Sequence, residues 1–475
     1  MKAITMPAAE IALEQNTIDD LKTRLQGELL LPGDAGYDDA RSIWNAMIDR
    51  HPAAIVRAKG VPDIVSAVRF AREHDLALSI KGGGHNVAGL AVSDGGLMLD
   101  MSLLRGVSVD PAARTARADP GSLLGDVDRA TQVHGLATVL GFFSITGIAG
   151  LTLGGGFGYL TRRFGWTSDN LLSMEVVTAD GRVVRASEEE NPDLFWGLRG
   201  GGGNFGVVTS FEYQLHPVGP EVVGGLIAWR GEDAPEVLEM YRHLVEQAPP
   251  ELTVAAMLRT APPAPWLPPE MHGKPMVGLL VLYSGPVDEG EKQVTAIKGF
   301  GSPVGDIVQR RTYVSQQSIV DATQPKGRRD YWKSEYLPRA EPEMLAMAVE
   351  HAGRMVSPHS VIVLFPVGGR LDRLPEDYSA MGNRDAAFAL NIAASWEKAE
   401  DDGANIEWTR AAWQDLRRFS TGGVYINFQS EDEGEDRIRA AYGTNYDRLV
   451  EIKTRWDPEN FFRVNKNIMP RLLQE

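Results

Sequence analysis

The chain has 475 residues, a net charge of −16, 43% hydrophobic residues and no cysteine. A chain of this length is longer than an ordinary domain with a single hydrophobic core, so two or three domains are expected. The acidic balance argues against nucleic acid and anionic membranes as partners, and the lack of cysteine excludes disulfides, thiol catalysis and thiolate metal sites. No apolar run is long enough for a signal peptide or a membrane span, which predicts a soluble, cytoplasmic protein.

The first 45 residues are mostly polar and are expected to form an N-terminal segment with a short helix over Asp19–Leu29. A short buried strand is predicted at Ala53–Val56, and Pro62 then opens a helix with one apolar face. A second strand over Leu76–Ile80 runs directly into a glycine loop. The pattern therefore predicts a βαβ unit whose second strand leads to His85.

The loop Gly82-Gly83-Gly84-His85 places a histidine directly after three glycines. Adjacent glycines cost backbone entropy and add nothing to a packed core, so they suit a main chain that closely approaches a bound anion. A tight turn after the strand is the alternative explanation. A second glycine-rich stretch, Ser144–Gly158, favours the anion site, because an acidic protein must hold an anion with backbone dipoles.

Residues 96–215 are predicted to form several short strands, two of them in a hairpin, and one helix. Asp180-Gly181 is a strong hairpin signal, and a third glycine cluster stands at Gly200–Gly203. The predicted strands are Gly96–Leu99, Gly106–Val109, Arg114–Ala118, Glu175–Ala179, Arg182–Ala186 and Val207–Leu215, and the predicted helix is Leu123–His134.

From 218 to 424 the pattern changes to longer strands that alternate with helices. This order predicts an α+β layer, with one sheet and helices on one of its faces. The strands are Val222–Trp229, Pro275–Tyr283, Ser360–Pro366 and Phe388–Trp396, and the helices are Pro235–Gln247, Asp288–Gly299, Glu341–Met355 and Gly403–Arg418.

The last segment regains the character of the first domain and contains a helix stopped by Asp457-Pro458. The predicted organisation is an N-terminal segment (1–45), a cofactor domain (46–217), a substrate domain (218–424) and a returning C-terminal segment (425–475). The glycine segments do not fit a dinucleotide fingerprint between strand and helix, and no phosphate-loop lysine, zinc-protease motif or serine elbow occurs. No metal site is expected.

Several motifs together resemble one family. They are Gly82-Gly83-Gly84-His85-Asn86, Thr146–Gly156, Asp193–Thr209, Tyr425–Phe428 and Phe461–Asn467. In this order they resemble the berberine-bridge-enzyme-like FAD-linked oxidases, bacterial type, of the vanillyl-alcohol oxidase superfamily. The resemblance implies a PCMH-type FAD-binding domain of two subdomains, and beside it an α+β substrate domain with an antiparallel sheet covered by helices.

The resemblance also implies how FAD is held. His85 matches the residue that carries an 8α-histidyl bond to the flavin, since a neutral imidazole can attack the flavin methyl in its quinone-methide form. Many relatives add a cysteinyl bond, but Phe143 stands at that place, so a single covalent link is expected. The implied FAD-binding residues are Lys81, Gly82, Gly83, Gly84, His85, Asn86, Gly89, Thr146, Gly147, Gly150, Leu151, Gly154, Gly155, Gly156, Gly158, Val207, Tyr425, Asn427, Asn465 and Asn467.

Tyr425 is the candidate catalytic base, because the tyrosine of this Tyr-x-Asn motif removes a substrate proton in several relatives. A phenol with a pKa near 10 needs a nearby cation to act at neutral pH. Lys333 is the first candidate for that cation and Arg373 the second. The alternatives are a packing role for Tyr425 and an ordinary solvated lysine at position 333.

The implied reaction is an oxidation in which a small alcohol, sugar or amine loses a hydride and a proton and O2 is reduced to H2O2. Two alternatives stay open: a flavin dehydrogenase of the same fold that reacts poorly with O2, and a flavin-binding protein with low turnover. The expected partners are the small substrate and O2, in a monomer or homodimer.

Overall fold

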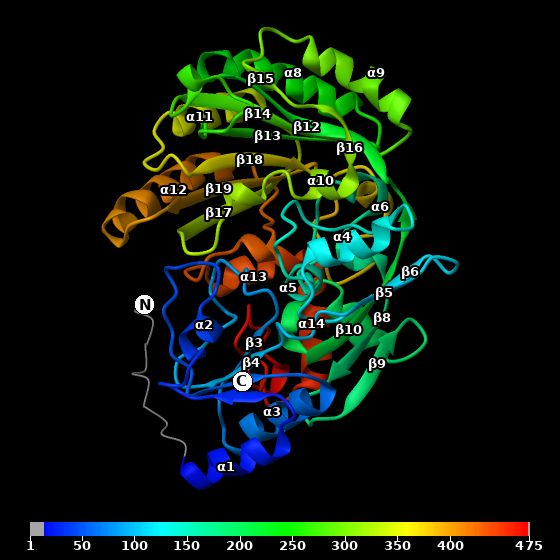
Figure 1. The fold of residues 1–475 in the computed structure, drawn as a ribbon, viewed down its shortest axis with the longest axis vertical. Helices are drawn as coiled ribbons and strands as arrows, with labels where there is room; N and C mark the ends of the chain where they lie inside the picture. Colours follow the sequence, from blue (N-terminus) through cyan, green and yellow to red (C-terminus); the bar gives the residue numbers. More distant parts are fainter. Residues whose placement is uncertain (1–13, 474–475) are drawn as a thin grey trace.

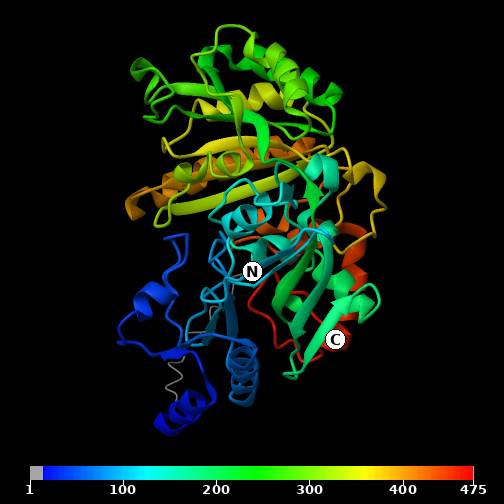
Figure 2. The ribbon, with the colours of Figure 1, turned by 45° about the vertical axis from the view of Figure 1, so that its right-hand side comes forward.

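The computed structural model describes residues 14–473 and contains two lobes (Figure 1). The lower lobe is built from the described part of the N-terminal half and from the C-terminal segment, so segments far apart in the sequence share one lobe (Figures 1 and 2). The upper lobe is built from the middle of the chain around one large sheet. Within residues 14–473, no helix is long and apolar enough to cross a membrane.

A four-stranded sheet at the base of the lower lobe carries the predicted βαβ unit. Strands β2 (Ala54–Arg57) and β3 (Leu78–Lys81) both pair in parallel with β4 (Leu97–Asp100), and helix α3 (Val61–Glu73) connects them. Strand β1 (Glu28–Leu30) adds an antiparallel edge to β2. The expected helix over Asp19–Leu29 is displaced: α1 (Gln15–Arg24) ends early because the chain turns into β1.

A five-stranded antiparallel sheet forms the other half of this lobe, in the order β5-β6-β10-β8-β9. Its core is shared with α7 (Pro192–Leu198) and with α14 (Tyr446–Trp456) of the C-terminal segment. The strands are β5 (Val107–Asp110), β6 (Thr115–Ala118), β8 (Leu171–Val177), β9 (Val183–Ser187) and β10 (Val207–Gln214), with a separate pair, β7 (Leu136–Ala137) and β11 (His216–Pro217). The helices are α2 (Tyr37–Arg41), α4 (Leu124–Gln132), α5 (Ile148–Leu153), α6 (Thr161–Phe164), α7 (Pro192–Leu198), α13 (Glu435–Tyr442) and α14 (Tyr446–Trp456).

The upper lobe contains an antiparallel sheet of eight strands, in the order β15-β12-β14-β13-β18-β19-β17, with β16 also paired to β12. Four of its strands, β13, β15, β16 and β17, were not predicted. β13 and β17 are buried on both faces, so neither shows the apolar alternation of a half-exposed strand, and β15 and β16 are only two and four residues long. The strands are β12 (Glu221–Arg230), β13 (Leu252–Thr260), β14 (Pro275–Tyr283), β15 (Gly305–Asp306), β16 (Gln309–Thr312), β17 (Arg329–Leu337), β18 (Val361–Pro366) and β19 (Phe388–Trp396).

Four long helices cover the face of this sheet that points away from the lower lobe (Figure 1). They are α8 (Ala234–Gln247), α9 (Val287–Lys298), α11 (Pro342–Ala352) and α12 (Asp402–Leu416). The other face packs toward the lower lobe, with the short α10 (Tyr313–Gln317) at its margin. The predicted α+β class, with helices on one face of an antiparallel sheet, is confirmed.

The C-terminal segment is fixed in the lower lobe by a buried ion pair. Lys453 on α14 lies 2.7 Å from Asp457, and both side chains are fully buried. The lysine also donates to the carbonyls of Asn204 and Phe462, at 2.9 Å each. The pair therefore joins the end of the chain to the third glycine cluster.

Replacing Asp457 with Asn is expected to lower the free energy of unfolding by about 3–5 kcal/mol, because it leaves the Lys453 charge buried without its partner. Urea unfolding followed by circular dichroism measures this loss. Arg455→Met on the same helix is the control: Arg455 is 71% exposed in its pair with Asp193, so its loss should cost at most about 1 kcal/mol. Equal costs for both variants would contradict the assignment.

Candidate active site

A cavity lies between the glycine loops of the lower lobe and the uncovered face of the upper sheet. It encloses about 1930 Å³ of space, part of it open to solvent. Residues of both lobes line it, so a ligand bound there would lie between the lobes.

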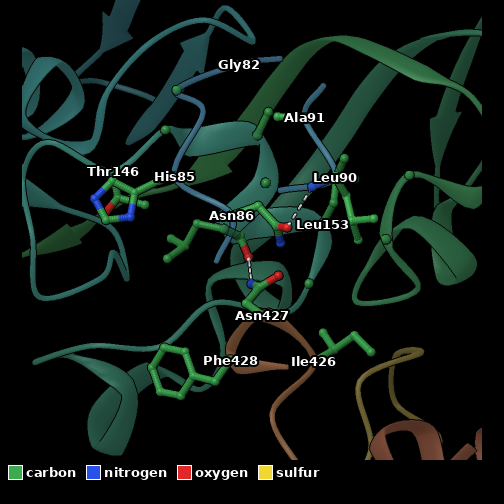
Figure 3. A pocket seen from close by; sticks show the side chains of 18 of the residues that line it. Gly82, His85, Asn86, Leu90, Ala91, Thr146, Leu153, Ile426, Asn427 and Phe428 are labelled. Carbon is green, nitrogen blue, oxygen red and sulfur yellow. Dashed lines mark hydrogen bonds between the residues drawn. The ribbon is translucent and has the colours of Figure 1, made fainter. Parts of the chain in front are cut away.

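The first wall is the loop Gly82–His85, which follows β3 (Figure 3). A Cβ added to Gly83 would lie 2.6 Å from the N and Cα atoms of Gly147 on the opposite loop. Only glycine allows the two main chains to approach this closely. Among the described residues, no acceptor is paired with the N–H groups of Gly83, Gly84 and His85, so these donors remain available to a ligand.

His85 lies in this wall with its ring stacked on Trp44, at a centroid distance of 4.5 Å and an interplanar angle of 17°. Trp44 is itself fixed by a 3.1 Å hydrogen bond from its Nε1 to the carbonyl of Gln324. The Nε2 atom of His85 is buried and has no hydrogen-bond partner within residues 14–473. Burial lowers the pKa of His85 to about 4, so the imidazole is neutral at pH 7 and keeps a free lone pair.

The second wall is the segment Thr146–Gly154 around α5. A Cβ at Gly150 would meet no atom within 4 Å, and the same holds for Gly203 in the third glycine cluster. Cavity space therefore lies directly against the main chain at both positions. The remaining predicted residues that line the cavity are Asn86, Leu151, Val207, Tyr425, Asn427 and Asn465.

Six of the residues predicted to bind the cofactor do not line the cavity: Lys81, Gly89, Gly155, Gly156, Gly158 and Asn467. The glycines among them allow close packing instead. A Cβ added to Gly89 would lie 2.6 Å from Ile48, and one added to Gly155 would lie 2.8 Å from Met381. A Cβ added to Gly156 would lie 2.4 Å from Thr167, and one added to Gly158 would lie 1.9 Å from the carbonyl of Leu140. Lys81 donates to the carbonyl of Ala40 at 2.6 Å, and Asn467 donates to the sulfur of Met469.

Tyr425 lines the cavity near its aromatic end and is 2% exposed. Its ring contacts those of Phe157 and Phe428, each at a centroid distance of 4.8 Å. Its phenolic oxygen accepts a 2.9 Å hydrogen bond from Asn427 Nδ2 and another from the main chain of Gly156. Burial raises the pKa of Tyr425 above its usual value, and the two donors partly oppose this shift. Gly156 thus reaches the site through its amide.

The structure contradicts the expectation that Lys333 lies beside Tyr425. Successive residues of a strand point to opposite faces, and on β17 Trp332 faces the cavity while Lys333 faces α12. Its Nζ lies 3.0 Å from Asp432 and 2.7 Å from Glu433, which together hold it as a structural ion pair.

Arg373 is also excluded as the activating cation, because it lies exposed outside the cavity wall. Lys466 is the one lysine or arginine among the described residues that line the cavity. It donates to the carbonyl of Ser430 at 2.6 Å, and burial lowers its pKa to about 8. The sequence-based prediction named its two neighbours, Asn465 and Asn467, but not Lys466 itself.

The upper sheet supplies a wall that sequence reasoning also missed. Along β18 and β19 the residues that line the cavity are every second one, as the two-residue period of a strand requires. These strands and β17 are buried on both faces, so the sequence carried no signal of which residues face the cavity. The lining residues of this sheet are Trp332, Val361, Val363, Phe365, Asn391 and Ala393.

Behind the loop at 141–146 lies a buried carboxyl group. Asp128 is 1% exposed, and its Oδ2 accepts a 3.2 Å hydrogen bond from Gln317, which also donates to the Gly141 carbonyl. Burial raises the pKa of Asp128 to about 7. The group therefore supports one edge of the cavity in its protonated form.

The contribution of Asp128 to stability should consequently fall as the pH rises from about 4 to 7, because native Asp128 keeps a proton that the unfolded chain has lost. The expected contribution is about 1.4 kcal/mol per pH unit. Asp128→Asn removes it, so the variant should gain stability relative to the wild type between pH 5 and pH 7 in urea titrations. Asp75→Asn, at a fully exposed site, is the control. A stability difference between Asp128→Asn and the wild type that is the same at pH 5 and at pH 7 would contradict the prediction.

Comparisons with known proteins agree with this geometry. The family described as FAD binding domain matches residues 52–187, and the family described as berberine and berberine like matches residues 424–469. An FAD-linked oxidoreductase of Dictyostelium discoideum is 28% identical over 95% of this chain and 97% of its own length. The (R)-6-hydroxynicotine oxidase of Paenarthrobacter nicotinovorans is 31% identical over 94% of this chain and 97% of its own length.

Two crystal structures have the same fold. That of 6-hydroxy-D-nicotine oxidase from Arthrobacter nicotinovorans superposes with a TM-score of 0.84 at 27% identity, covering 94% of this chain and 98% of the other. That of berberine bridge enzyme from Eschscholzia californica superposes with a TM-score of 0.85 at 18% identity, covering 96% and 99%. At this lower identity the likeness concerns the fold alone.

The residues of the cavity fit FAD. The unpaired amides of Gly83 to His85 suit a diphosphate, and main chain borders open space at Gly150 and Gly203. The Oδ1 atom of Asn465 is buried without a partner in the part of the chain that the structure describes, as expected of an amide that awaits a ligand. His85 offers its free Nε2 in the same cavity.

Proposed function

Since the chain belongs to the berberine-bridge-enzyme-like FAD-linked oxidoreductases, we propose that it is an oxidase that removes a hydride and a proton from a small organic substrate. The observation that carries the proposal is Tyr425: a buried phenol, held by two donors, in a cavity that also fits FAD. The electron acceptor is O2, which is reduced to H2O2.

Bound FAD supplies the two-electron oxidant for this reaction. The residues that would hold it are the glycine walls at 82–84 and 147–154, with His85, Asn427 and Asn465. The aromatic rings at the upper end of the cavity exclude water, so the substrate carbon that loses hydride is shielded from competing reactions.

Tyr425 would take the proton from the substrate hydroxyl or amine. Its phenolate is disfavoured by burial, and the amides of Asn427 and Gly156 are placed to offset that cost by donating to the same oxygen. In this proposal, hydrogen bonds replace the cation that Lys333 was expected to supply.

His85 would carry the single covalent link to FAD. Its neutral ring and free Nε2 support this role, and the chain has no cysteine for a second link. In the net reaction, an N–C bond replaces the imidazole N–H and one C–H of the flavin 8α-methyl. The two protons and two electrons that are released would reduce one O2 to H2O2.

The names of the relatives support an oxidase that acts on an amine or a sugar. One relative is a hydroxynicotine oxidase, and among the structures that share the fold are a xylooligosaccharide oxidase and a chitooligosaccharide oxidase.

Reoxidation of the substrate-reduced holoprotein tests the proposal. A panel of alcohols, sugars and amines is first added without oxygen, and flavin bleaching identifies a substrate. Mixing with O2 should then restore the colour rapidly and release one H2O2 per substrate. Slow recovery with O2 and fast recovery with a dye acceptor would establish a dehydrogenase, and no bleaching by any compound would favour a low-turnover flavin protein.

A further inference from the structure

Trp44 contacts His85 but does not itself line the cavity. The two rings are nearly parallel, with 4.5 Å between their centroids, and Trp44 is 4% exposed. The main-chain N–H of Trp44 also donates to the carbonyl of Gly84 at 2.9 Å. Trp44 therefore supports both the imidazole of His85 and the peptide bond that precedes it, from outside the cavity.

The imidazole needs such a support because little else determines its orientation. The second side-chain torsion of a histidine is broad, not confined to three staggered positions, and the glycines before His85 add no side chains that would restrain the loop. In many sites a hydrogen bond from a neighbour to the second ring nitrogen orients the imidazole. In the described part of the chain, the hydrogen bond at this ring comes from the main chain of His85 itself. The stack on Trp44 is therefore the contact that can fix the plane of the ring.

Trp44 is in turn fixed by the upper lobe. Its Nε1 donates to the carbonyl of Gln324 at 3.1 Å, and its own carbonyl accepts a hydrogen bond from the N–H of Gly327 at 3.2 Å. Its ring meets that of Trp332 on β17 edge to face, with 5.5 Å between centroids and an interplanar angle of 66°. The indole is thus held in one orientation by a loop and a strand of the other lobe.

We propose that Trp44 is a positioning residue for the covalent attachment of FAD: by stacking on the imidazole, it holds the ring of His85 toward the cavity. The inference rests on the proposed function, in which His85 carries the link. The bond exchange is the one given above, with an N–C bond in place of one N–H and one C–H and with O2 reduced to H2O2. Trp44 takes no part in that exchange and only keeps the reacting ring in line for it.

The share of the bound FAD that is covalent tests the inference. Each holoprotein is purified, its total FAD is measured from the flavin absorbance, and its covalent FAD is measured from the intact mass of the denatured polypeptide. Nearly all bound FAD should be covalent in the wild type. Trp44→Leu removes the stacked ring, so the covalent share should fall about tenfold while FAD still binds, because a reacting group that is no longer held in line reacts more slowly.

Trp44→Phe separates the stack from the hydrogen bond. It keeps an aromatic ring and removes the Nε1 donor to Gln324, so it should restore most of the covalent share. Trp44→Met, whose flexible side chain fills irregular space, replaces the leucine variant if that variant folds poorly.

Trp229→Leu is the matched control for the loss of a buried indole. Trp229 is 1% exposed and donates from Nε1 to the carbonyl of Phe300 at 2.9 Å. It packs in the core between the upper sheet and its helices, away from the cavity. Its replacement should leave all bound FAD covalent.

An unchanged covalent share in Trp44→Leu or Trp44→Met would overturn the inference, and so would a share in Trp44→Phe as low as that of the leucine variant. A folded Trp44→Leu protein without any FAD would assign Trp44 to cofactor binding and would also overturn it. The proposed attachment fails separately: a wild-type protein whose FAD is entirely non-covalent would remove the role of His85. A covalent wild type with an equally covalent Trp44→Leu variant would retain that role and remove only the role of Trp44.

Discussion

Replacing Tyr425 with Phe is expected to lower the rate of anaerobic flavin reduction by substrate by about 10²–10⁴-fold, the usual contribution of a positioned acid or base. The variant keeps the ring contacts with Phe157 and Phe428 and removes only the oxygen that Asn427 and Gly156 hold. Stopped-flow bleaching of the flavin absorbance measures this rate apart from reoxidation.

Tyr241→Phe is the matched control for the loss of a buried phenol. Its hydroxyl donates to the Leu364 carbonyl at 3.3 Å on the helix-covered side of the sheet, so its removal should leave the reduction rate unchanged. If Tyr425→Phe also reduces normally, Tyr425 is a packing residue and the proton has another acceptor.

The second large effect is expected from Gly83→Val, which should give a folded protein with little or no FAD. Even the Cβ of the new side chain would overlap the main chain of Gly147 at 2.6 Å, and neither main chain can yield as a flexible side chain would. The two walls must therefore separate. The ratio of flavin absorbance to protein concentration in the purified variant measures the loss.

Gly403→Ala is the control for a glycine replacement, because a Cβ there meets no atom within 4 Å and the residue lies in the exposed first turn of α12. It should keep full FAD content and gain about 0.5–1 kcal/mol of stability. A Gly83→Val variant with normal FAD content would show that the close approach of the two loops is not needed for binding.

The parts of the site that could be predicted are those that form short sequence motifs. The glycines before His85 and the Tyr-x-Asn segment each carry a chemical requirement that is visible in a few adjacent residues. The structure brings His85 and Tyr425 into one cavity although they are far apart in the chain.

The side of β17 that faces the cavity could not be predicted in the same way. Lys333 and Trp332 are neighbours in sequence, and a strand buried on both faces gives no apolar alternation to decide which of them faces the site. The charged residue was the more obvious catalytic candidate, yet its partners, Asp432 and Glu433, come from a distant segment.

The roles of individual glycines also depend on long-range contacts. Gly154 lines the cavity, whereas Gly155 faces Met381 and Gly156 faces Thr167. All three read alike in the sequence.

The intact mass of the denatured protein tests the central claim, that the cavity holds one FAD fixed by His85. The wild-type polypeptide should exceed its sequence mass by one FAD, and acid precipitation should leave the yellow colour in the pellet. His85→Ala should have the mass of the polypeptide alone, while His134→Ala, at an exposed position, should keep the added mass. A wild-type protein with the bare polypeptide mass, or a His85→Ala variant that keeps the added mass, would contradict the claim.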